Sequence, residues 1–413
     1  MAPNIDNYNA DELEAPAWLN EKFFKEVLIK FLNDPNVKVI NFETSPATAK
    51  GDHYASVMFR GIVEYSTQKG TFSKSLIIKT MPEEDGHKKE FLGESHIFPT
   101  EISMYTEILP KLEQILAEAG EKVTFCAKCI YHTREPRQVM VFEDLVPQHY
   151  EVIRKRPASV EEIKSALAKL AKWQAVSYKL LQEKSSLFDK LQYDLTTMPN
   201  FLEQDLLKTA FPLFLESLQS VESLRKYVKY FEPLKDVVVQ RWVETIREYR
   251  ENRKDNTYYV LCHGDFHVKN MMFKGTDCML LDFQMSYVGS MANDVLYAVY
   301  MLLGPDERRE KYDELIYYFF TTFTNTLSKI GYKGKMPTLV EYRRQLFENR
   351  YIEIFLATTF LPTFNHMRKG NDPAEFIENA DKRRELFFEK EFHDELEYLL
   401  PRMVHLGYFE QLK

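Results

Sequence analysis

The chain is poor in glycine and cysteine, and it lacks long apolar runs. Only 14 of its 413 residues are glycine, about half the share usual in globular proteins. Its four cysteines are too few for a disulfide framework in a chain of this length. No apolar run reaches the roughly 18 residues that a membrane-spanning helix needs. These absences argue against a disulfide-rich secreted module and against an integral membrane protein.

Positive charge is also in short supply. Lysine and arginine number 54 against 62 aspartate and glutamate, a formal net charge of −8. An acidic surface disfavours nucleic acid as a partner, although a local basic pocket for a small phosphate compound stays possible. Residues 1–16 contain four acidic side chains and no apolar core, so we expect no secretory signal. We therefore predict a soluble cytoplasmic protein without a nucleic-acid, membrane or obligate protein partner.

What remains is ordinary globular composition. Apolar residues make up 45% of the chain, charged residues 28% and aromatic residues 14%. Such values argue against wholesale disorder. The length suggests two or three domains, or two lobes that share one cleft.

The first part of the chain has the patterns of a small lobe. Residues 17–32 have the spacing of an amphipathic helix, which we expect to dock on its own domain rather than on a membrane. Residues 37–80 contain strand-like runs, and residues 98–118 have helical spacing. Two further short strands follow near 124–132 and 138–142. We assign residues 1–145 to this β-rich lobe.

Beyond residue 146 the patterns are mostly helical. Ser159 and Glu162 have the spacing of a capping box at a helix start. Five more helices are predicted at about 201–229, 233–253, 308–330, 338–360 and 374–399. One β-rich segment, near 258–282, interrupts them. The predicted fold is therefore α+β and bilobal, with a large helical lobe over residues 146–413.

Two polar motifs, each after an apolar strand, carry the strongest functional signal. The first is HGDFHVKN at 263–270, and the second is LLDFQ at 280–284. Asp265 and Asn270 have the D-x-x-x-x-N spacing of a kinase catalytic loop, and Asp282-Phe283 occupies the place of D-F in D-F-G. Asp265 would accept the proton of an attacking hydroxyl. Asn270 and Asp282 would hold Mg²⁺ against the phosphates of a nucleotide.

These motifs have two other interpretations. Aspartate and asparagine are common in turns between strands, but two motifs at this separation favour kinase-like chemistry. His263, Asp265 and His267 could also bind a transition metal. No other histidine-rich cluster completes such a site. On the kinase interpretation His263 is a structural hydrogen-bonding residue behind the loop.

A kinase-like site also needs a strand lysine and a helix glutamate. Lys79 ends the apolar run SLIIK. Glu101 shares one helical face with apolar residues at i, i+3 and i+4 spacing, so it points inward, where a carboxylate needs a partner. We predict that Lys79 and Glu101 form an ion pair. Glu94 and Glu107 are weaker candidates for that partner.

Two segments of the small lobe are candidates for nucleotide contacts. No G-x-G-x-x-G exists, and residues 49–56, with Gly51 and Ser56, are the candidate phosphate loop. The alternative there is an ordinary hairpin turn. The apolar run that leaves the lobe at 139–145 fits a hinge, where backbone groups of Glu143 and Leu145 would bond adenine.

The sequence also contains a C-x-x-C pair, Cys126 and Cys129. A structural zinc site needs two more ligands at a similar spacing. Cys262 and Cys278 lie 16 positions apart and form no such pair. We therefore predict structural thiols.

Taken together, these motifs resemble the ecdysteroid kinase-like family, the CHK-kinase-like group within the aminoglycoside phosphotransferase and choline kinase superfamily. The segments that carry the resemblance are GDHYAS, IIK, FPTEISMY, VFEDL, HGDFHVKN and LLDFQMSYVGSMANDVLY. The likeness covers about residues 17–400, nearly the whole chain. The resemblance implies a protein-kinase-like fold, ATP and Mg²⁺ as cofactors, and phosphorylation of a small-molecule hydroxyl. It places Lys79 and Glu101 as the ion pair, Asp265 as base, and Asn270 and Asp282 as metal ligands. It also places Asp294 as a structural residue at a helix start.

The acceptor is predicted to be a small molecule. Twelve positions separate Asp282 from Asp294, where a helix begins, which leaves no room for a long activation loop to display a peptide. The aromatic segments IYYFFTTF and IEIFLATTFLPTF would line an apolar pocket, or else pack in the helical lobe. A hydrophobic alcohol, such as an ecdysteroid or a xenobiotic, is the preferred substrate. A choline or ethanolamine kinase and a catalytically silent binding protein are the alternatives.

Overall fold

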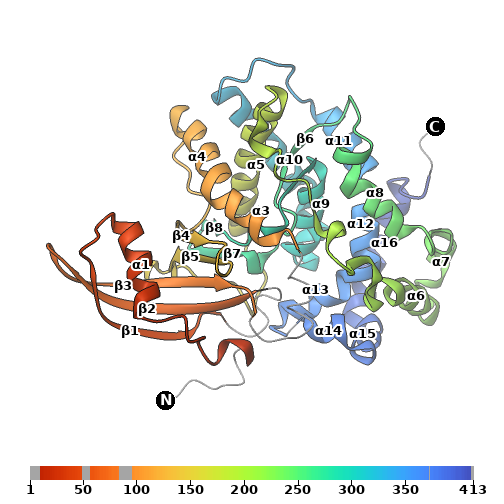
Figure 1. Cartoon of the computed structure of the whole chain (residues 1–413). Helices are drawn as coiled ribbons and strands as arrows, with labels where there is room; N and C mark the ends of the chain where they lie inside the picture. The colour runs from red at the N-terminus through yellow and green to blue at the C-terminus, as the bar shows by residue number, and fades with distance from the viewer. Residues whose placement is uncertain (1–9, 49–55, 83–94, 372, 411–413) are drawn as a thin grey trace.

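A computed structural model describes residues 10–48, 56–82, 95–371 and 373–410 of the chain. An antiparallel sheet with one helix forms one end of the molecule, and a mainly helical part forms the rest (Figure 1). The predicted α+β class, with a β-rich first part and a mainly helical second part, is confirmed.

The sheet contains five strands in the order β1-β2-β3-β5-β4, and every neighbouring pair is antiparallel. Their bounds are β1 (Lys38–Pro46), β2 (Val57–Thr67), β3 (Gly70–Thr80), β4 (Cys129–Thr133) and β5 (Val139–Glu143). Strand β5 pairs with β4, its neighbour in sequence, and also with β3, from which residues 81–138 separate it in the chain.

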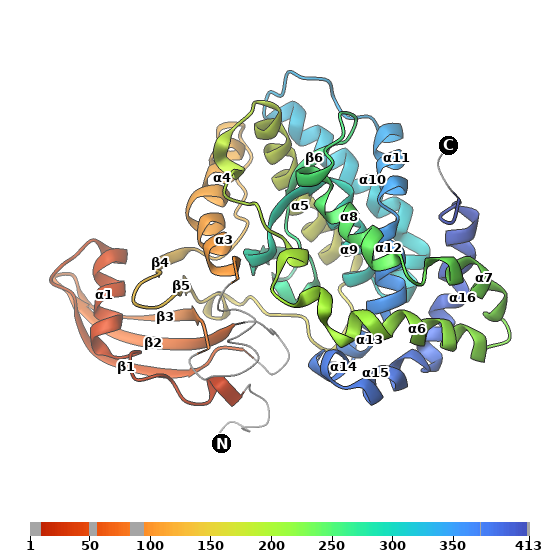
Figure 2. The ribbon, with the colours of Figure 1, turned by 45° about the vertical axis from the view of Figure 1, so that its right-hand side comes forward.

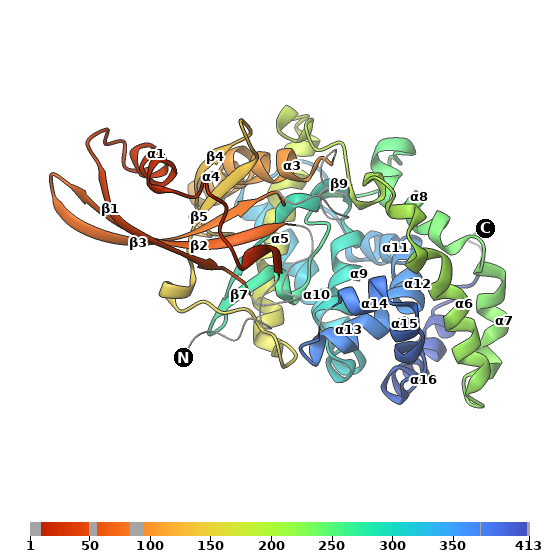
Figure 3. The same ribbon diagram turned by 60° about the horizontal axis from the view of Figure 1, so that its bottom comes forward.

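Helix α1 (Glu21–Leu32) covers one face of this sheet, as predicted for a helix docked on its own domain (Figure 3). Asn20 caps the helix by accepting a hydrogen bond from the Phe23 N–H at 3.3 Å. Phe24 packs so closely on β2 that a Cβ at Gly61 would lie 2.8 Å from its ring. The absence of a side chain at Gly61 therefore allows this contact.

Alternation along the strands decides which side chains reach the other face. In β3, Leu76 and Ile78 belong to the buried cluster with α1, and Ile77 and Lys79 point to the opposite side. Lys79 therefore faces the helical part of the molecule.

The single helix predicted at 98–118 is interrupted. It consists of α3 (Ile97–Ser103), a π-helical turn (Met104–Ile108) and α4 (Leu109–Glu118). π-Helical turns inside α-helices are often found at functional sites. The side chains predicted to face inward are all buried: Phe98, Glu101, Tyr105, Ile108 and Leu112. Helix α3 lies between the sheet and the remaining helices (Figure 2).

The helical part contains α5 (Val160–Gln182), α6 (Asp205–Ser220), α7 (Val228–Phe231), α8 (Val238–Glu251), α9 (Ala292–Met301) and α10 (Pro305–Lys329). Towards the end of the chain follow α11 (Leu339–Glu348), α12 (Tyr351–Phe355), α13 (Leu361–Arg368), α14 (Ala374–Glu378), α15 (Ala380–Phe387) and α16 (Lys390–His405). The capping box of Ser159 and Glu162 at the start of α5 is present. In the part of the chain that the structure describes, no helix is long and apolar enough to cross a membrane.

Three of the predicted long helices are divided. The segment 201–229 breaks after Ser220, and 374–399 becomes α14, α15 and α16. The segment 338–360 becomes α11, α12 and a π-helical turn (Leu356–Phe360) that leads into α13. Pro362 at the start of α13 has no N–H, so it fits the first turn of a new helix better than the interior of a continuous one.

Two short strand pairs hold the motif-bearing loops inside the helical part. Strand β6 (Tyr259–Cys262) pairs with β9 (Tyr287–Ser290), and β7 (Met271–Lys274) pairs with β8 (Asp277–Leu280). The 263–270 motif leaves β6, and the 280–284 motif leaves β8. The two pairings bring the ends of these strands, and thus the two motifs, together.

Candidate active site

Lys79, Glu101 and Asp282 meet between the sheet and the helical part. Nζ of Lys79 lies 2.6 Å from Oε2 of Glu101 and 2.8 Å from Oδ1 of Asp282. Lys79 and Glu101 are 3% and 1% exposed. Burial, together with the neighbouring Asp282 carboxylate, raises the pKa of Glu101 to about 7 in spite of its ion pair with Lys79. The three groups, from β3, α3 and the segment after β8, form one buried charge cluster.

The buried ring of His263 forms hydrogen bonds to both motifs. Its side chain is fully buried; Nε2 bonds the Leu281 carbonyl at 3.0 Å, and Nδ1 accepts the Asp265 N–H at 3.3 Å. Burial lowers the pKa of His263 to about 4, so the ring is neutral at neutral pH. A neutral ring with one N–H and one bare nitrogen suits one carbonyl and one N–H partner. Since both ring nitrogens are engaged, the alternative of a transition-metal site at His263, Asp265 and His267 is not supported.

Gly264 is required where the loop turns next to the second motif. Its φ is +83°, and a Cβ there would lie 2.1 Å from the Met285 carbonyl oxygen. The carboxylate of Asp294, at the start of α9, accepts the backbone N–H groups of His263 at 2.7 Å and Gly264 at 3.1 Å. Asp294 therefore holds the loop in place, in agreement with the structural role that the resemblance implied.

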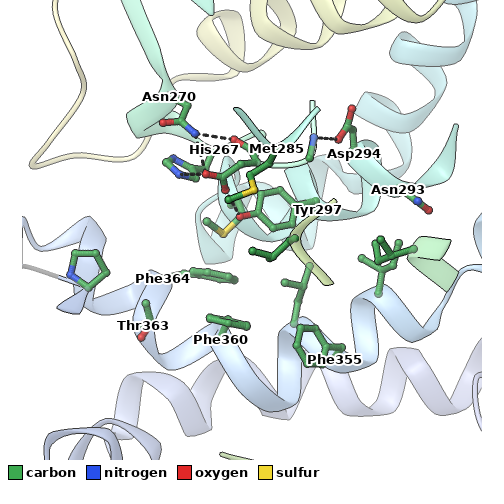
Figure 4. Close-up of a pocket in the computed structure, with 18 of the residues that line it drawn as sticks. His267, Asn270, Met285, Asn293, Asp294, Tyr297, Phe355, Phe360, Thr363 and Phe364 are labelled. Carbon is green, nitrogen blue, oxygen red and sulfur yellow. Dashed lines mark hydrogen bonds and ion pairs between the residues drawn. The ribbon is translucent and has the colours of Figure 1, made fainter. Parts of the chain in front are cut away.

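The Asp265 carboxylate is held by three side chains, those of Asn270, His267 and Tyr297, which Figure 4 labels. Tyr297 donates to Oδ1 at 2.7 Å, Asn270 donates through Nδ2 to Oδ2 at 3.0 Å, and Nε2 of His267 lies 3.3 Å from Oδ2. Burial opposes ionisation of Asp265, but His267 and the Tyr297 hydroxyl outweigh it and lower its pKa below the ordinary value. Burial and Asp265 raise the pKa of Tyr297 well above 10.0, so its hydroxyl stays a donor.

Asn270 and Asp282 have the atoms needed to hold Mg²⁺. The Asn270 amide nitrogen donates to Asp265, which leaves its amide oxygen as the free acceptor of that side chain. Asp282 has a φ of +59°. The residue before it, Leu281, donates its backbone N–H to the Asn270 carbonyl at 2.9 Å. Oxygen ligands of this kind suit Mg²⁺. Among the described residues no group of three histidine, cysteine, aspartate or glutamate side chains could hold a metal ion.

A cavity beside Lys79 has the character of a nucleotide site. Its walls include apolar side chains from both parts of the molecule: Ile77, Ala127, Phe142, Leu145, Met272 and Leu281. Lys79, Asn270 and Asp282 also line it, as does the buried Ser56. Gly51, the other residue predicted for the phosphate loop, lies outside the described residues, as does Glu94.

The segment after β5 borders this cavity at the predicted hinge. Asp144 accepts hydrogen bonds from Arg60 Nε and Ser75 Oγ, both at 2.7 Å, and from the Val146 N–H at 3.0 Å. Glu143 pairs with Lys74 at 3.1 Å. Leu145, the residue after Asp144, also lines the cavity.

A second, mostly apolar cavity lies on the Asp265 side of the loop (Figure 4). Asp265, His267 and Tyr297 form its polar end. Its apolar walls come from elements far apart in sequence: Phe201, Trp242, Met285, Phe355, Phe360 and Phe364. The rings of Phe360 and Phe364 are nearly parallel, with centroids 6.2 Å apart.

Only one of the two aromatic segments singled out in the sequence lines this cavity. The segment 352–364 does so, through Ile352, Phe355, Leu356, Phe360 and Phe364. The segment 316–323 does not line it. Its rings at 319, 320 and 323 pack in the core of the helical part. Phe320 stacks on Tyr342, and Phe323 meets Tyr178 edge to face. For that segment the alternative of packing within the helical lobe holds.

Three residues line both cavities: Lys269, Asn270 and Asp282. Asn270 and Asp282 are predicted from the sequence. Lys269 is not predicted, and neither is Tyr297, which bonds the predicted base. The spacing of Tyr297 from Asp294, i+3 on the helix after the second motif, is the signal that could have identified it, because such residues share a helix face.

The C-x-x-C pair shows no ligand geometry. Cys126 and Cys129 are half-buried free thiols. Burial raises the pKa of the Cys129 thiol to about 12 and that of Cys126 well above its ordinary value. Thiols of this kind are unreactive.

The fold and the site define a kinase-like phosphotransferase: a strand lysine paired with a helix glutamate, and a D-x-x-x-x-N loop next to a second aspartate. The model of the ecdysteroid kinase-like family matches residues 50–332. The chain therefore belongs to this family, and the resemblance seen in the sequence is confirmed. No curated protein matches the chain.

Solved structures match the chain only weakly, with low sequence identities and low TM-scores. A choline kinase from Cryptosporidium parvum Iowa II matches with a TM-score of 0.44 at 10% identity, over 94% of this chain and 98% of that one. A spectinomycin phosphotransferase matches with a TM-score of 0.40 at 12% identity, over 94% and 99%. An amicoumacin kinase matches with a TM-score of 0.38 at 14% identity, over 92% and 94%. The family assignment rests on the family model and not on these structures.

Proposed function

We propose that the protein is an ATP- and Mg²⁺-dependent kinase that phosphorylates the hydroxyl group of a hydrophobic alcohol, such as an ecdysteroid or a xenobiotic. One observation carries the proposal. A cavity that holds a lysine–carboxylate cluster and an apolar cavity that holds an oriented aspartate meet at Asn270 and Asp282. Phosphoryl transfer requires a donor and an acceptor on opposite sides of such a junction.

The cavity beside Lys79 would hold the nucleotide. Backbone groups of Glu143 and Leu145 at the hinge would bond adenine. The apolar side chains around Phe142 and Leu281 would enclose the base, and Lys79 would bind the phosphates. Asn270 and Asp282 would hold Mg²⁺ through oxygen atoms. When bound, Mg-ATP supplies the phosphoryl group and neutralises part of its charge.

Asp265 would orient the acceptor and take its proton. Its carboxylate lies at the polar end of the apolar cavity and is fixed by Tyr297, Asn270 and His267. A carboxylate with a lowered pKa is a weak base, so we infer that it aligns the hydroxyl and accepts the proton as the new bond forms. Positioning and charge neutralisation would then supply most of the acceleration.

The shape and chemistry of the second cavity favour an apolar acceptor. Aromatic and aliphatic side chains dominate its walls, and Asp265, His267 and Tyr297 are among the polar groups that line it. Such an arrangement binds an apolar body and directs one hydroxyl towards the base. Between Asp282 and Asp294 the chain forms only a short helical turn and β9, so it has no loop that could present a peptide.

The test is a screen of hydroxylated steroids and plant phenolics with labelled ATP and Mg²⁺, with choline and ethanolamine as further acceptors. We expect Asp265→Asn to keep Mg-ATP binding in a thermal-shift measurement and to lower turnover by about 10²- to 10⁴-fold. A near-normal rate would refute the role of Asp265. Transfer only to choline or ethanolamine would establish that alternative, and nucleotide binding without any product would indicate a silent binding protein. The cytoplasmic location stays a prediction that cell fractionation tests.

A further inference from the structure

Tyr105 lines the cavity beside Lys79 and is only 8% exposed. It belongs to the π-helical turn between α3 and α4. Its ring packs against the rings of Phe142 and Phe283, with centroids 4.7 and 5.0 Å away. The helix, strand β5 and the second motif therefore hold this ring in one position.

The hydroxyl group of Tyr105 has no hydrogen-bond partner among the residues that the structure describes. Burial, and after it the neighbouring Cys126 side chain, raises the pKa of Tyr105 well above its ordinary value, so the hydroxyl keeps its proton. Such a hydroxyl can donate one hydrogen bond and accept others. A buried polar group without a partner is destabilising, and most such groups in folded proteins find one. A ligand in the cavity that Tyr105 lines would supply that partner.

The neighbours of the ring indicate which part of a nucleotide would lie closest to it. Phe142, which packs on Tyr105, directly precedes Glu143 at the predicted hinge. Ala127, from the segment before β4, lines the same cavity. An adenine ring bonded to the hinge backbone would turn the edge that carries N7 and the 6-amino group towards Phe142 and Tyr105. We call this edge the inner edge of the base.

We propose that Tyr105 is a nucleotide-binding residue whose hydroxyl forms a hydrogen bond to the inner edge of the adenine ring. This inference rests on the proposed kinase function. The hydroxyl would donate to N7 or accept from the 6-amino group. The base takes no part in phosphoryl transfer, so the bond would stabilise the bound nucleotide equally before and during the reaction. Its loss would therefore weaken nucleotide binding and leave kcat nearly unchanged.

The experiment uses Tyr105→Phe, which keeps the packed ring and removes only the hydroxyl. Tyr317→Phe, at a tyrosine of α10 that is 53% exposed, is the matched control. Calorimetric titration of the full-length protein measures the affinity for Mg-ADP and needs no acceptor. Two analogues extend the comparison: 7-deaza-ADP, in which C–H replaces N7, and the 5′-diphosphate of purine riboside, which lacks the 6-amino group. Circular dichroism and thermal unfolding show whether each variant folds.

We expect Tyr105→Phe to weaken Mg-ADP binding by about 5- to 20-fold, as for the loss of one hydrogen bond that leaves a buried partner unpaired. Tyr317→Phe should have no effect. In the wild type, at least one analogue should bind more weakly than ADP. The same analogue should lose less affinity in Tyr105→Phe, because the bond is already absent there. The analogue that shows this non-additivity identifies the bonded atom.

Equal affinities of the wild type and Tyr105→Phe for Mg-ADP would overturn the inference and leave the kinase function intact. So would analogue effects of the same size in both proteins, because the hydroxyl would then contact no atom of the inner edge. A wild-type protein that neither binds Mg-ADP nor transfers phosphate would overturn both proposals. If Tyr105→Phe fails to fold, the analogues decide in the wild type: weaker binding of either one supports the contact, and unchanged binding of both overturns it.

Discussion

The hydroxyl of Tyr297 donates a hydrogen bond of 2.7 Å to Oδ1 of Asp265. Tyr297 belongs to α9, whereas Asp265 belongs to the loop after β6. The two residues are joined because Asp294, three residues earlier on α9, bonds the backbone of the same loop. One helix therefore positions both the backbone of the loop and the side chain of the proposed base.

The first prediction concerns this bond. Tyr297→Phe keeps the ring but removes the hydroxyl, and a hydrogen bond to a charged group contributes about 1.5–3 kcal/mol. We expect kcat to fall by about 10- to 100-fold, with the KM for ATP and the melting temperature nearly unchanged. Tyr317→Phe, at an exposed tyrosine of α10, is the matched control. An unchanged kcat in Tyr297→Phe would show that Asn270 and His267 suffice to hold Asp265.

The second prediction concerns the backbone of the loop at Gly264. Alanine there would have to adopt a φ of +83° and would place Cβ 2.1 Å from the Met285 carbonyl oxygen. In Gly331→Ala the φ is +71°, but nothing lies within 4 Å of the added Cβ. We expect Gly331→Ala to cost about 1 kcal/mol of unfolding free energy from backbone strain alone.

Gly264→Ala should cost at least about 2 kcal/mol more than Gly331→Ala, because the Met285 backbone must also move. Urea denaturation of the two variants measures the difference. Equal losses in the two variants would show that the loop around Gly264 relaxes without cost.

The third prediction concerns stability in acid. The folded state keeps the pKa of His263 at about 4, below the ordinary value of 6.5. Between these pH values the unfolded chain binds more protons than the folded chain. The contribution of His263 to stability is therefore fully present above about pH 6.5 and is lost as the pH falls towards 4.

From pH 7 to pH 5 this loss amounts to about 2 kcal/mol. We expect His263→Gln to be less stable than the wild type at pH 7 and to lose correspondingly less unfolding free energy between the two pH values. His132→Gln, at an exposed histidine, should keep the wild-type dependence. Parallel pH dependences in all three proteins would contradict the neutral, buried state of His263. Denaturant unfolding at both pH values measures the effect.

The fourth prediction separates the two cavities. Phe360 lines only the apolar cavity, and full burial of an aromatic side chain contributes about 1.5–3 kcal/mol. Phe360→Ala should therefore raise the KM for a hydrophobic acceptor by about tenfold or more and leave the KM for ATP unchanged. Phe388→Ala, at a half-buried ring away from both cavities, is the control for a general loss of packing. A change confined to the KM for ATP would place the acceptor elsewhere.

Local patterns in the sequence predicted a large part of the fold and of the candidate site. Alternation in the run SLIIK directs Lys79 away from the α1 core, and helical spacing directs Glu101 inward, so their meeting followed from two local periods. The order of motifs predicted the family and the α+β class. The boundaries of long helices were less predictable, because a proline or a π-helical turn ends a helix without disturbing the apolar spacing that suggested it.

By itself, the sequence determined which residue types follow which strands, and hence the kind of chemistry: a lysine, a glutamate, two aspartates and an asparagine at kinase-like spacings. Only the tertiary structure decided what lies next to them. It placed Tyr297 on Asp265, put Lys269 between the two cavities, and sent one aromatic segment to a cavity wall and the other to the core. Periodicity within a segment shows which face is apolar. What that face meets depends on long-range packing between elements that are far apart in the chain.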